Sequence, residues 1–186
     1  HGERLREKDI ETIVKDVVER HLSTVEIAAF LTALSIHGLS TGENEALSRA
    51  MVATGKTLSF GEAPILDKHS VGGIPGDKTS MLIVPIVAAA GFTIPKTSSR
   101  AITSPAGTAD RVETLCPVNL SINEIKDVVS KTNGCLVWGG SLELAPADDL
   151  FIQIEYPLGI DPMLLPSILS KKKAIGATHV AIDIPT

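Results

Sequence analysis

Residues 65–113 read ILDKHSVGGIPGDKTSMLIVPIVAAAGFTIPKTSSRAITSPAGTADRVE, and this stretch decides the fold that we expect. A short apolar run at 64–66 predicts a strand, and a longer one at 81–90 predicts a helix. Between them lies a glycine-rich turn, and Asp77 stands where the N-cap of the helix is expected. The backbone N–H groups of such a turn converge on one point, where the helix dipole also favours an anion. The order strand, turn, helix therefore predicts an α/β unit with an anion-binding turn.

The side chains of this turn favour a phosphate as the anion. They supply positive charge and hydroxyl donors beside Gly72, Gly73 and Gly76, from Lys68, Ser70, Lys78, Thr79 and Ser80. The spacing matches neither the pattern Gly-x-x-x-x-Gly-Lys-Ser/Thr nor the dinucleotide pattern Gly-x-Gly-x-x-Gly. Glycines alone would indicate no more than a tight turn. Their combination with lysines, His69 and hydroxyls predicts a phosphate-binding turn.

A second polar cluster follows the next expected strand. Six hydroxyl residues and Arg100 fall within 97–110, before an expected helix start. A Ser/Thr-rich segment is ordinarily a solvated loop. Two such segments, each closing a strand and opening a helix, indicate one crevice at the carboxyl ends of parallel strands. An anionic or sugar ligand suits this crevice.

Composition narrows the class of protein. The chain has 186 residues, a net charge of −5 and 3% aromatic residues, which argues against a nucleic-acid-binding surface. No apolar run approaches the roughly 20 residues that span a bilayer. The charged start HGERLREKDIE shows no signal peptide, so we expect a cytoplasmic protein without a membrane partner. Cys116 and Cys135 lack metal-ligand spacing, and we expect two free buried thiols, with a disulfide as the alternative.

Hydrophobic periodicity predicts a helical part followed by an α/β part. Helices are expected at 9–22, at 24–36 and from 41 or 42 to about 55, and Ser23 with Glu26 forms a capping box. Beyond them we expect strands at 64–67, 91–95, 134–138 and 178–184, with helices at 77–90, 107–115 and 121–132. Asp161 followed by Pro162 is typical of a helix N-cap. The fold class is therefore a small helical domain plus a mostly parallel, doubly wound α/β domain.

Several motifs together resemble a known family. They are Lys-His-Ser-x-Gly-Gly, Gly-Asp-x-Thr-Ser, Ile-Pro-x-x-Ser-x-Arg, Gly-Thr-x-Asp-x-x-Glu, Leu-Ala-Pro-Ala-Asp at 144–148 and Ser-Ile-Leu-Ser-Lys-Lys at 167–172. The pattern is similar to the thymidine (pyrimidine nucleoside) phosphorylase family. Pro75 and the run SSRAITSPAGTAD at 98–110 look like its archaeal AMP phosphorylase branch. A more distant resemblance is to anthranilate phosphoribosyltransferase, so the implied fold is of the nucleoside phosphorylase and phosphoribosyltransferase type.

The resemblance implies a domain organisation and an assembly. Residues 1–61 and 146–176 would form the helical domain, and 62–145 with 177–186 the α/β phosphate-binding domain. Family members are longer, so a fragment with an incomplete α/β domain is expected. The family also implies a homodimer formed through the helical domain, with larger assemblies in a full-length protein.

The resemblance further implies a reaction and its residues. AMP and phosphate would give adenine and ribose 1,5-bisphosphate, with inorganic phosphate as co-substrate and neither a cofactor nor a metal. The implied catalytic residues are Asp161, as proton donor to the base, and His69. Phosphate would bind to Lys68, Ser70, Ser80, Ser98 and Thr108. AMP would bind to Gly73, Ser99, Arg100, Ala101, Ile102, Thr103, Ser104, Thr108, Ser167 and Lys171.

Three alternatives remain open at the level of the sequence. A pyrimidine nucleoside phosphorylase is the first, although the arginine that such enzymes carry is missing from FIQIEYPLGID at 151–161. A phosphoribosyltransferase is the second and would need magnesium, for which Asp148 and Asp149 are weak candidates. A non-catalytic nucleotide-binding or assembly fragment is the third.

Overall fold

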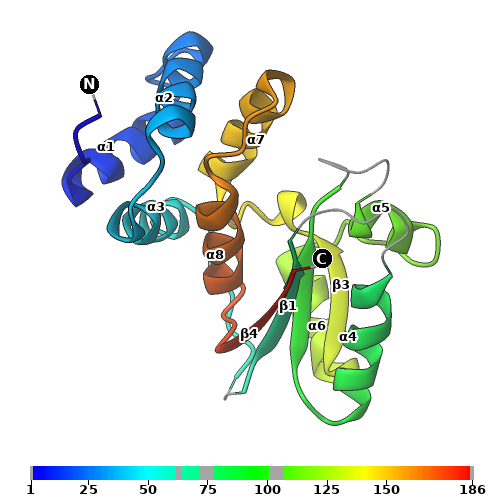
Figure 1. The fold of residues 1–186 in the computed structure, drawn as a ribbon. Coiled ribbons are helices and arrows are strands. Elements are labelled where there is room, and N and C mark those ends of the chain that lie inside the picture. The colour runs from blue at the N-terminus through cyan, green and yellow to red at the C-terminus, as the bar shows by residue number, and fades with distance from the viewer. Residues whose placement is uncertain (1, 62–63, 72–77, 101–106, 185–186) are drawn as a thin grey trace. The chain divides into compact units, whose positions relative to one another are not determined.

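The computed structural model describes residues 2–61, 64–71, 78–100 and 107–184. The chain forms two compact units (Figure 1). The helical unit comprises His1–Lys56 and Leu144–Lys171, and the α/β unit comprises Thr57–Glu143 and Lys172–Thr186. The domain boundaries expected from the family remain a prediction.

The helical unit is built from five helices with clear start signals. They are α1 (Glu7–Val18), α2 (Thr24–His37), α3 (Thr41–Ala53), α7 (Pro146–Leu158) and most of α8 (Leu164–Ala174). The predicted capping box of Ser23 and Glu26 is confirmed, and Gly38 ends α2 with a φ of 68°. The first helix ends at Val18, earlier than expected, because Arg20 takes a left-handed conformation with a φ of 62°.

One hydrophobic core holds this unit together. Helix α7 packs against α1, α2 and α3, and the rings of Phe30 and Phe151 lie 6.4 Å apart. Burial of such side chains from water is the main stabilising contribution. The core residues without solvent exposure are Ile10, Val14, Val17, Leu31, Leu47, Met51, Ala147, Phe151 and Met163.

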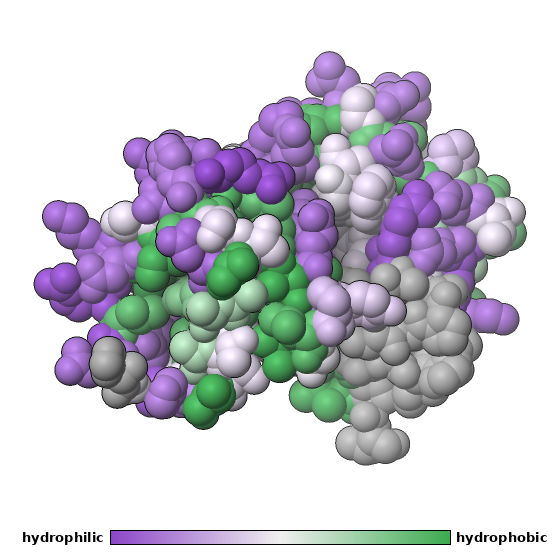
Figure 2. Space-filling model, turned by 90° about the horizontal axis from the view of Figure 1, so that it is seen from above, coloured by the Kyte–Doolittle hydropathy of each residue, from purple (hydrophilic) through white to green (hydrophobic). Residues whose placement is uncertain are grey.

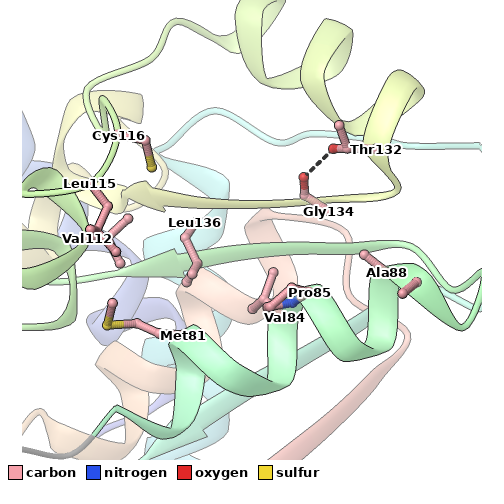
Figure 3. Close-up of a pocket in the computed structure, with 11 residues that line it drawn as sticks. Met81, Val84, Pro85, Ala88, Val112, Leu115, Cys116, Thr132, Gly134 and Leu136 are labelled. Atoms are coloured by element: carbon pink, nitrogen blue, oxygen red, sulfur yellow. Dashed lines mark hydrogen bonds between the residues drawn. The ribbon is translucent and has the colours of Figure 1, made fainter.

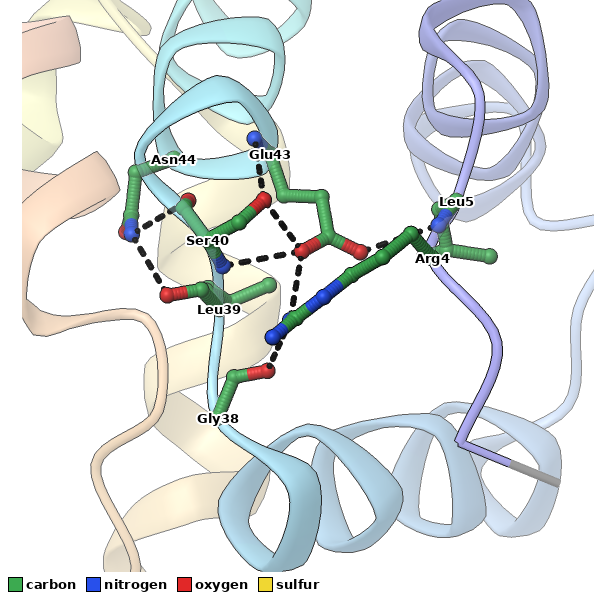
Figure 4. A network of polar contacts seen from close by, with 7 residues as sticks. All are labelled: Arg4, Leu5, Gly38, Leu39, Ser40, Glu43 and Asn44. Atoms are coloured by element: carbon green, nitrogen blue, oxygen red, sulfur yellow. Dashed lines mark hydrogen bonds and ion pairs between the residues drawn. The ribbon is translucent and has the colours of Figure 1, made fainter.

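A buried glutamate fixes the N-terminal segment to the start of α3 (Figure 4). The Glu43 carboxylate accepts hydrogen bonds from the Leu5 N–H at 2.9 Å, from the Ser40 N–H at 2.8 Å and from the Arg4 guanidinium at 2.9 Å. Burial alone would raise its pKa, but the bonds from Ser40, Leu5 and Arg4 outweigh burial and lower the pKa to about 2. Glu43 is therefore held as a carboxylate.

The α/β unit contains two pairs of parallel strands. Strand β1 (Leu66–Ser70) pairs with β4 (His179–Asp183), and β2 (Ile94–Ser98) pairs with β3 (Gly134–Trp138). An isolated parallel bridge between Ile65 and Thr93 joins the pairs. Helices α4 (Thr79–Ala89), α5 (Thr108–Glu113) and α6 (Ile122–Thr132) pack on β3, and a short 3-10 helix, η1 (Gly139–Leu142), follows it. The predicted parallel α/β part is confirmed.

Several element boundaries differ from the sequence expectation. Strands β1 and β2 each extend about three residues further than expected, since Lys68, Ser70, Lys96 and Ser98 are polar strand residues rather than loop residues. The N-cap of α4 is Lys78, and Asp77 lies outside the described residues. Helix α8 begins at Leu164, so Asp161 and Pro162 belong to the turn before it and not to its first residues. Across the described ranges, no helix is both long and apolar enough to cross a membrane.

Candidate active site

A cluster of buried charges lies in the α/β unit. The Lys172 ammonium is 2.8 Å from Asp67 Oδ2, and the Lys68 ammonium is 2.9 Å from Asp183 Oδ1. Lys68 also donates to the Ser70 hydroxyl. Asp67, Lys68 and Lys172 are each only 3% exposed. Buried charges persist only when they are paired or bind a ligand, so this cluster is the strongest candidate site in the unit.

Lys96 belongs to the same cluster but has a different environment. It is 3% exposed, and its ammonium donates to the backbone carbonyl of Thr97. Burial is the main cause that lowers its pKa well below the ordinary value, and the positive charge of Lys172 lowers it further. Within the described part of the chain, Lys96 forms no ion pair with a carboxylate.

The residues predicted to bind phosphate are spread over four neighbouring elements. Lys68 and Ser70 lie on β1, Ser98 ends β2, Ser80 is in the first turn of α4 and Thr108 is the first residue of α5. The Ser98 hydroxyl oxygen is buried and lacks a hydrogen-bond partner among the residues that the structure describes. His69 lies between Lys68 and Ser70, and alternation along a strand directs it to the opposite face.

The predicted nucleotide-binding segment is described only at its two ends. Gly73 and the residues Ala101, Ile102, Thr103 and Ser104 lie outside the described residues. The Arg100 guanidinium donates to both Glu113 carboxylate oxygens, at 2.6 and 2.8 Å, and to Asp110 at 3.0 Å. It also lies 4.8 Å from the centre of the Trp138 ring. The carboxylates of Asp110 and Glu113 therefore hold the Arg100 guanidinium through charge-assisted hydrogen bonds. The contact of Arg100 with AMP stays a prediction.

Gly107 closes the other end of this segment. A Cβ atom there would lie 2.4 Å from the carbonyl carbon of Arg100 and 2.5 Å from the carbonyl oxygen of Ser99. The Gly107 N–H donates to Asp110 at 2.8 Å, and Ser99 accepts the Ala109 N–H at 3.2 Å. Asp110 therefore contacts both Arg100 and Gly107, which holds these two residues together at the start of α5.

In the helical unit, a fully buried acid brings two predicted residues together. Asp148 Oδ2 accepts a hydrogen bond from the Ser167 hydroxyl at 2.9 Å and lies 2.5 Å from the Lys171 ammonium. Burial lowers the pKa of Lys171, but the charge and hydrogen bond of Asp148 outweigh it and raise this pKa overall. Asp148 was part of a recognised motif, but its role as the partner of both residues was missed because the pairing connects different helices.

Three further carboxyl groups of this unit have raised pKa values. Burial, followed by the negative charge of Asp148, raises the pKa of Asp161. Burial raises the pKa of Glu155 to about 7, although Glu155 accepts the Met163 N–H at 3.0 Å. Burial also raises the pKa of Asp149 to about 6. Groups of this kind can hold and release a proton near neutral pH, as a general acid requires.

An apolar pocket of about 490 Å³ lies between α4, α5, α6 and β3 (Figure 3). Its wall includes Met81, Val84, Leu115, Cys116 and Leu136, and its described lining carries no charged side chain. It therefore does not suit a phosphate. Cys116 is exposed and Cys135 is buried, and both are free thiols. The expectation of two free thiols holds, but burial of Cys116 was wrong because it follows the end of α5 at the surface.

Comparison with known proteins gives the class of this chain. A glycosyl transferase family model for the a/b domain matches residues 62–160, and one for the helical bundle domain matches residues 1–55. The chain therefore belongs to this glycosyl transferase family. The anthranilate phosphoribosyltransferase from Thermus thermophilus has a similar fold, with a TM-score of 0.85 and 25% sequence identity over 100% of this chain and 56% of that one.

Particular relatives are much more similar in sequence. The AMP phosphorylase of Thermofilum pendens is 60% identical over 185 residues, which is 100% of this chain and 36% of that protein. The AMP phosphorylase of Thermococcus kodakarensis is 58% identical, over 100% of this chain and 37% of that protein. The expected similarity to archaeal AMP phosphorylases is confirmed. The chain spans little more than a third of the length of these relatives.

Proposed function

We propose that the protein catalyses phosphorolysis of AMP. The bond between the ribose anomeric carbon and the adenine nitrogen breaks, and a phosphate oxygen forms the new bond to that carbon. A proton passes to the departing adenine, and ribose 1,5-bisphosphate is the other product. The single observation that carries this proposal is the 60% identity, over the whole chain, to a protein named AMP phosphorylase.

The α/β unit supports binding of the phosphate co-substrate. Its buried lysines hold positive charge in a poorly solvated place, where an anion is bound more strongly than in water. Lys68 and the hydroxyls of Ser70, Ser80, Ser98 and Thr108 would orient the phosphate oxygen toward the anomeric carbon. No metal or organic cofactor is part of this proposal.

The helical unit supports protonation of the leaving base. Asp161 can donate a proton only if it is protonated near neutral pH, and burial together with Asp148 raises its pKa in that direction. Asp148 holds both Ser167 and Lys171, so that the Ser167 hydroxyl oxygen can accept a hydrogen bond from the base and the remaining N–H groups of Lys171 can donate to it. We keep His69 as a second catalytic candidate: it lies between Lys68 and Ser70 in the sequence of β1, with its side chain on the opposite face of the strand.

The segment 99–104 is proposed to bind the nucleotide. The contacts of Asp110 with Arg100 and Gly107, which flank the residues 101–106, support this proposal. Binding of the 5′-phosphate by this segment would explain a preference for nucleotides over nucleosides. Gly73 and Thr108 complete the proposed AMP set.

We further propose a homodimer formed through the helical unit. Val25 and Ile36 of α2 are 77% and 74% exposed, and Tyr156 of α7, which packs against α2, is 67% exposed. Figure 2 shows, on the face that it presents, hydrophobic residues at the surface among hydrophilic ones. A second copy would remove this apolar area from water. The cytoplasmic location stays a prediction from composition.

Substitution Asp161→Asn tests the proposed function at its chemical step. Asparagine keeps the shape but cannot donate the proton, so kcat for adenine release from AMP should fall by about 10²- to 10⁴-fold. Asp127→Asn, on the exposed face of α6, is the matched control and should leave kcat unchanged. Unchanged turnover in Asp161→Asn would remove Asp161 as the general acid.

A further inference from the structure

One buried carboxyl group of the helical unit has no part in the proposed reaction. Glu155 lies in the last turn of α7 and is only 4% exposed. Its Oε1 atom accepts a hydrogen bond at 3.0 Å from the Met163 N–H, eight residues further along the chain. Met163 is fully buried in the core of this unit. Glu155 therefore anchors the turn that connects α7 to α8.

Asp161, the proposed general acid, lies exposed in this turn. The turn begins at Gly159, which ends α7 in a left-handed conformation with a φ of 66°, and it leads into α8 at Leu164. A general acid must come within hydrogen-bond reach of the atom that it protonates. An exposed turn residue holds such a position only if the turn is fixed from the interior, and the hydrogen bond of Glu155 fixes it.

The hydrogen bond of Glu155 replaces one that Asp161 would otherwise make. An aspartate before a proline is typical of a helix N-cap, and the side chain of such a cap accepts the N–H two or three residues further on. Counted from Asp161, these are the N–H groups of Met163 and Leu164. Glu155 accepts the first, and the backbone carbonyl of Asp161 accepts the second at 3.4 Å. Both groups are therefore satisfied without the Asp161 side chain.

The Asp161 carboxyl group is consequently available to a ligand. Burial and the negative charge of Asp148 raise its pKa, and no hydrogen bond from a described residue is among the causes. A hydrogen bond from a backbone N–H would stabilise the carboxylate and lower this pKa. If Asp161 capped α8 itself, it would lose its proton at lower pH and would be bonded to Met163 instead of the base.

We propose that Glu155 is a positioning residue: it accepts the Met163 N–H in place of Asp161 and so leaves the Asp161 carboxyl group free to donate its proton to the leaving base. This inference rests on the proposed function, and it adds a residue that the sequence motifs did not assign. The titratable groups that act on Glu155 are Asp161 and Asp148, and Asp148 also acts on Asp161, so the three carboxyl groups lie near one another.

Steady-state kinetics of the whole protein test this inference with Glu155→Met, which removes the acceptor, and Glu155→Gln, which keeps it. The substrates are AMP and AMP methylated at N7 of adenine, whose base already carries a positive charge and leaves without taking up a proton. Glu155→Met should lower kcat about tenfold for AMP and less than about threefold for the methylated nucleotide. Glu155→Gln should keep both values within about threefold of the wild type. Glu11→Met, at an exposed position of α1, is the control and should change neither.

Two further measurements separate positioning from a purely structural role. In Glu155→Met, Asp161 can accept the Met163 N–H, so kcat for AMP should begin its alkaline decline about one pH unit lower, and in Glu155→Gln at the wild-type pH. In an Asp161→Asn background, Glu155→Met should lower kcat by less than about threefold more, because both residues act on one step. Thermal unfolding checks that each variant folds. Glu155→Asp, whose shorter side chain cannot reach the Met163 N–H, takes the place of Glu155→Met if that variant does not fold.

The inference is overturned if Glu155→Met keeps kcat for AMP within about threefold of the wild type, or loses it equally for both nucleotides. An equal loss in Glu155→Gln would overturn it as well. Its failure is distinguishable from failure of the proposed function, which a wild type that releases no adenine from AMP would remove. In that case NMR titration of the Asp161 carboxyl group decides: a pKa that falls in Glu155→Met but not in Glu155→Gln supports the role of Glu155, and equal values overturn it.

Discussion

Asp148 and Lys171 form a close ion pair in the helical unit, with 2.5 Å between carboxylate and ammonium. Asp148 has no solvent exposure, so its charge acts strongly on every neighbour. It raises the pKa of Lys171 against the effect of burial, and after burial it is the next cause that raises the pKa of Asp161. One acid thereby raises the pKa of both a lysine and a carboxylic acid in the same unit.

Asp148→Asn should therefore shift the pH dependence of the reaction. Asp161 is active when protonated, so kcat declines as the pH rises through its pKa. Removal of the Asp148 charge lowers this pKa, and the decline should begin at lower pH. The half-buried Lys171 would lose its counter-charge, so stability should fall by up to about 3 kcal/mol. The pH profile of kcat between about pH 5 and 9 checks this shift.

Asp149→Asn is the control for that profile. Asp149 is adjacent in sequence and also has a raised pKa, but it is not among the groups that shift the pKa of Asp161. Its substitution should not change the pH at which kcat declines on the alkaline side of the profile. If kcat of the Asp148→Asn enzyme declined at the same pH as that of the wild type, Asp148 would not set the pKa of the general acid.

Glu155→Gln should make stability less dependent on pH. The folded-state pKa of Glu155 is raised from 4.5 to about 7, so its contribution is fully present below pH 4.5 and is lost as the pH rises through about 7. Glutamine can still accept the Met163 N–H. At about pH 8 the variant should be more stable than the wild type by on the order of 1–3 kcal/mol. Urea unfolding at several pH values measures the difference, and a difference that is constant with pH would contradict the prediction.

Gly107→Ala should weaken AMP binding. A methyl group at Gly107 cannot fit beside the backbone of Ser99 and Arg100, so Gly107 and Arg100 must move apart. We expect KM for AMP to rise about tenfold and stability to fall by about 1–3 kcal/mol. Gly42→Ala is the control, because nothing lies within 4 Å of the added carbon and the site is in helix α3. If the Gly107→Ala enzyme had the wild-type KM for AMP, the turn at Gly107 would not contribute to nucleotide binding.

Glu43→Gln should destabilise the helical unit by about 1–2 kcal/mol at neutral pH. The folded-state pKa is lowered from 4.5 to about 2, so the contribution of Glu43 is present above pH 4.5 and is lost as the pH falls toward 2. Glu26→Gln is the control, since Glu26 has the same capping box with Ser23 but is exposed. Equal losses in thermal unfolding of the two variants would show that the contacts to Arg4 and Leu5 contribute nothing.

The sequence predicted the elements of the fold better than the polar interior. Capping boxes and apolar stripes locate α2 and α6, because local side-chain chemistry decides a helix start. Lys68 and Lys96 were expected at or beyond the strand ends, because a lysine normally faces water. Only the tertiary pairing of Lys68 with Asp183, and the burial of Lys96 near Lys172, makes these residues part of the strands.

The candidate site was predicted by motif and not by geometry. The spacing of Ser167 and Lys171 predicted that they lie on one face of a helix. Their shared contact with Asp148 agrees with this prediction. Glu155 carried no sequence signal, because a glutamate in a helix is usually solvated. Arg100 was expected to bind the nucleotide. Its two hydrogen bonds to Glu113 could not be predicted, because the sequence showed only a segment rich in hydroxyl residues.

Phosphate-dependent release of free base is the measurement that tests the central claim most directly. AMP, adenosine and thymidine are compared as substrates, with and without inorganic phosphate, and the free base is quantified. We expect adenine from AMP only when phosphate is present, with little base from either nucleoside. Thymine release instead would move the chain to the pyrimidine nucleoside phosphorylases, and AMP binding without any base release would contradict an enzymatic role.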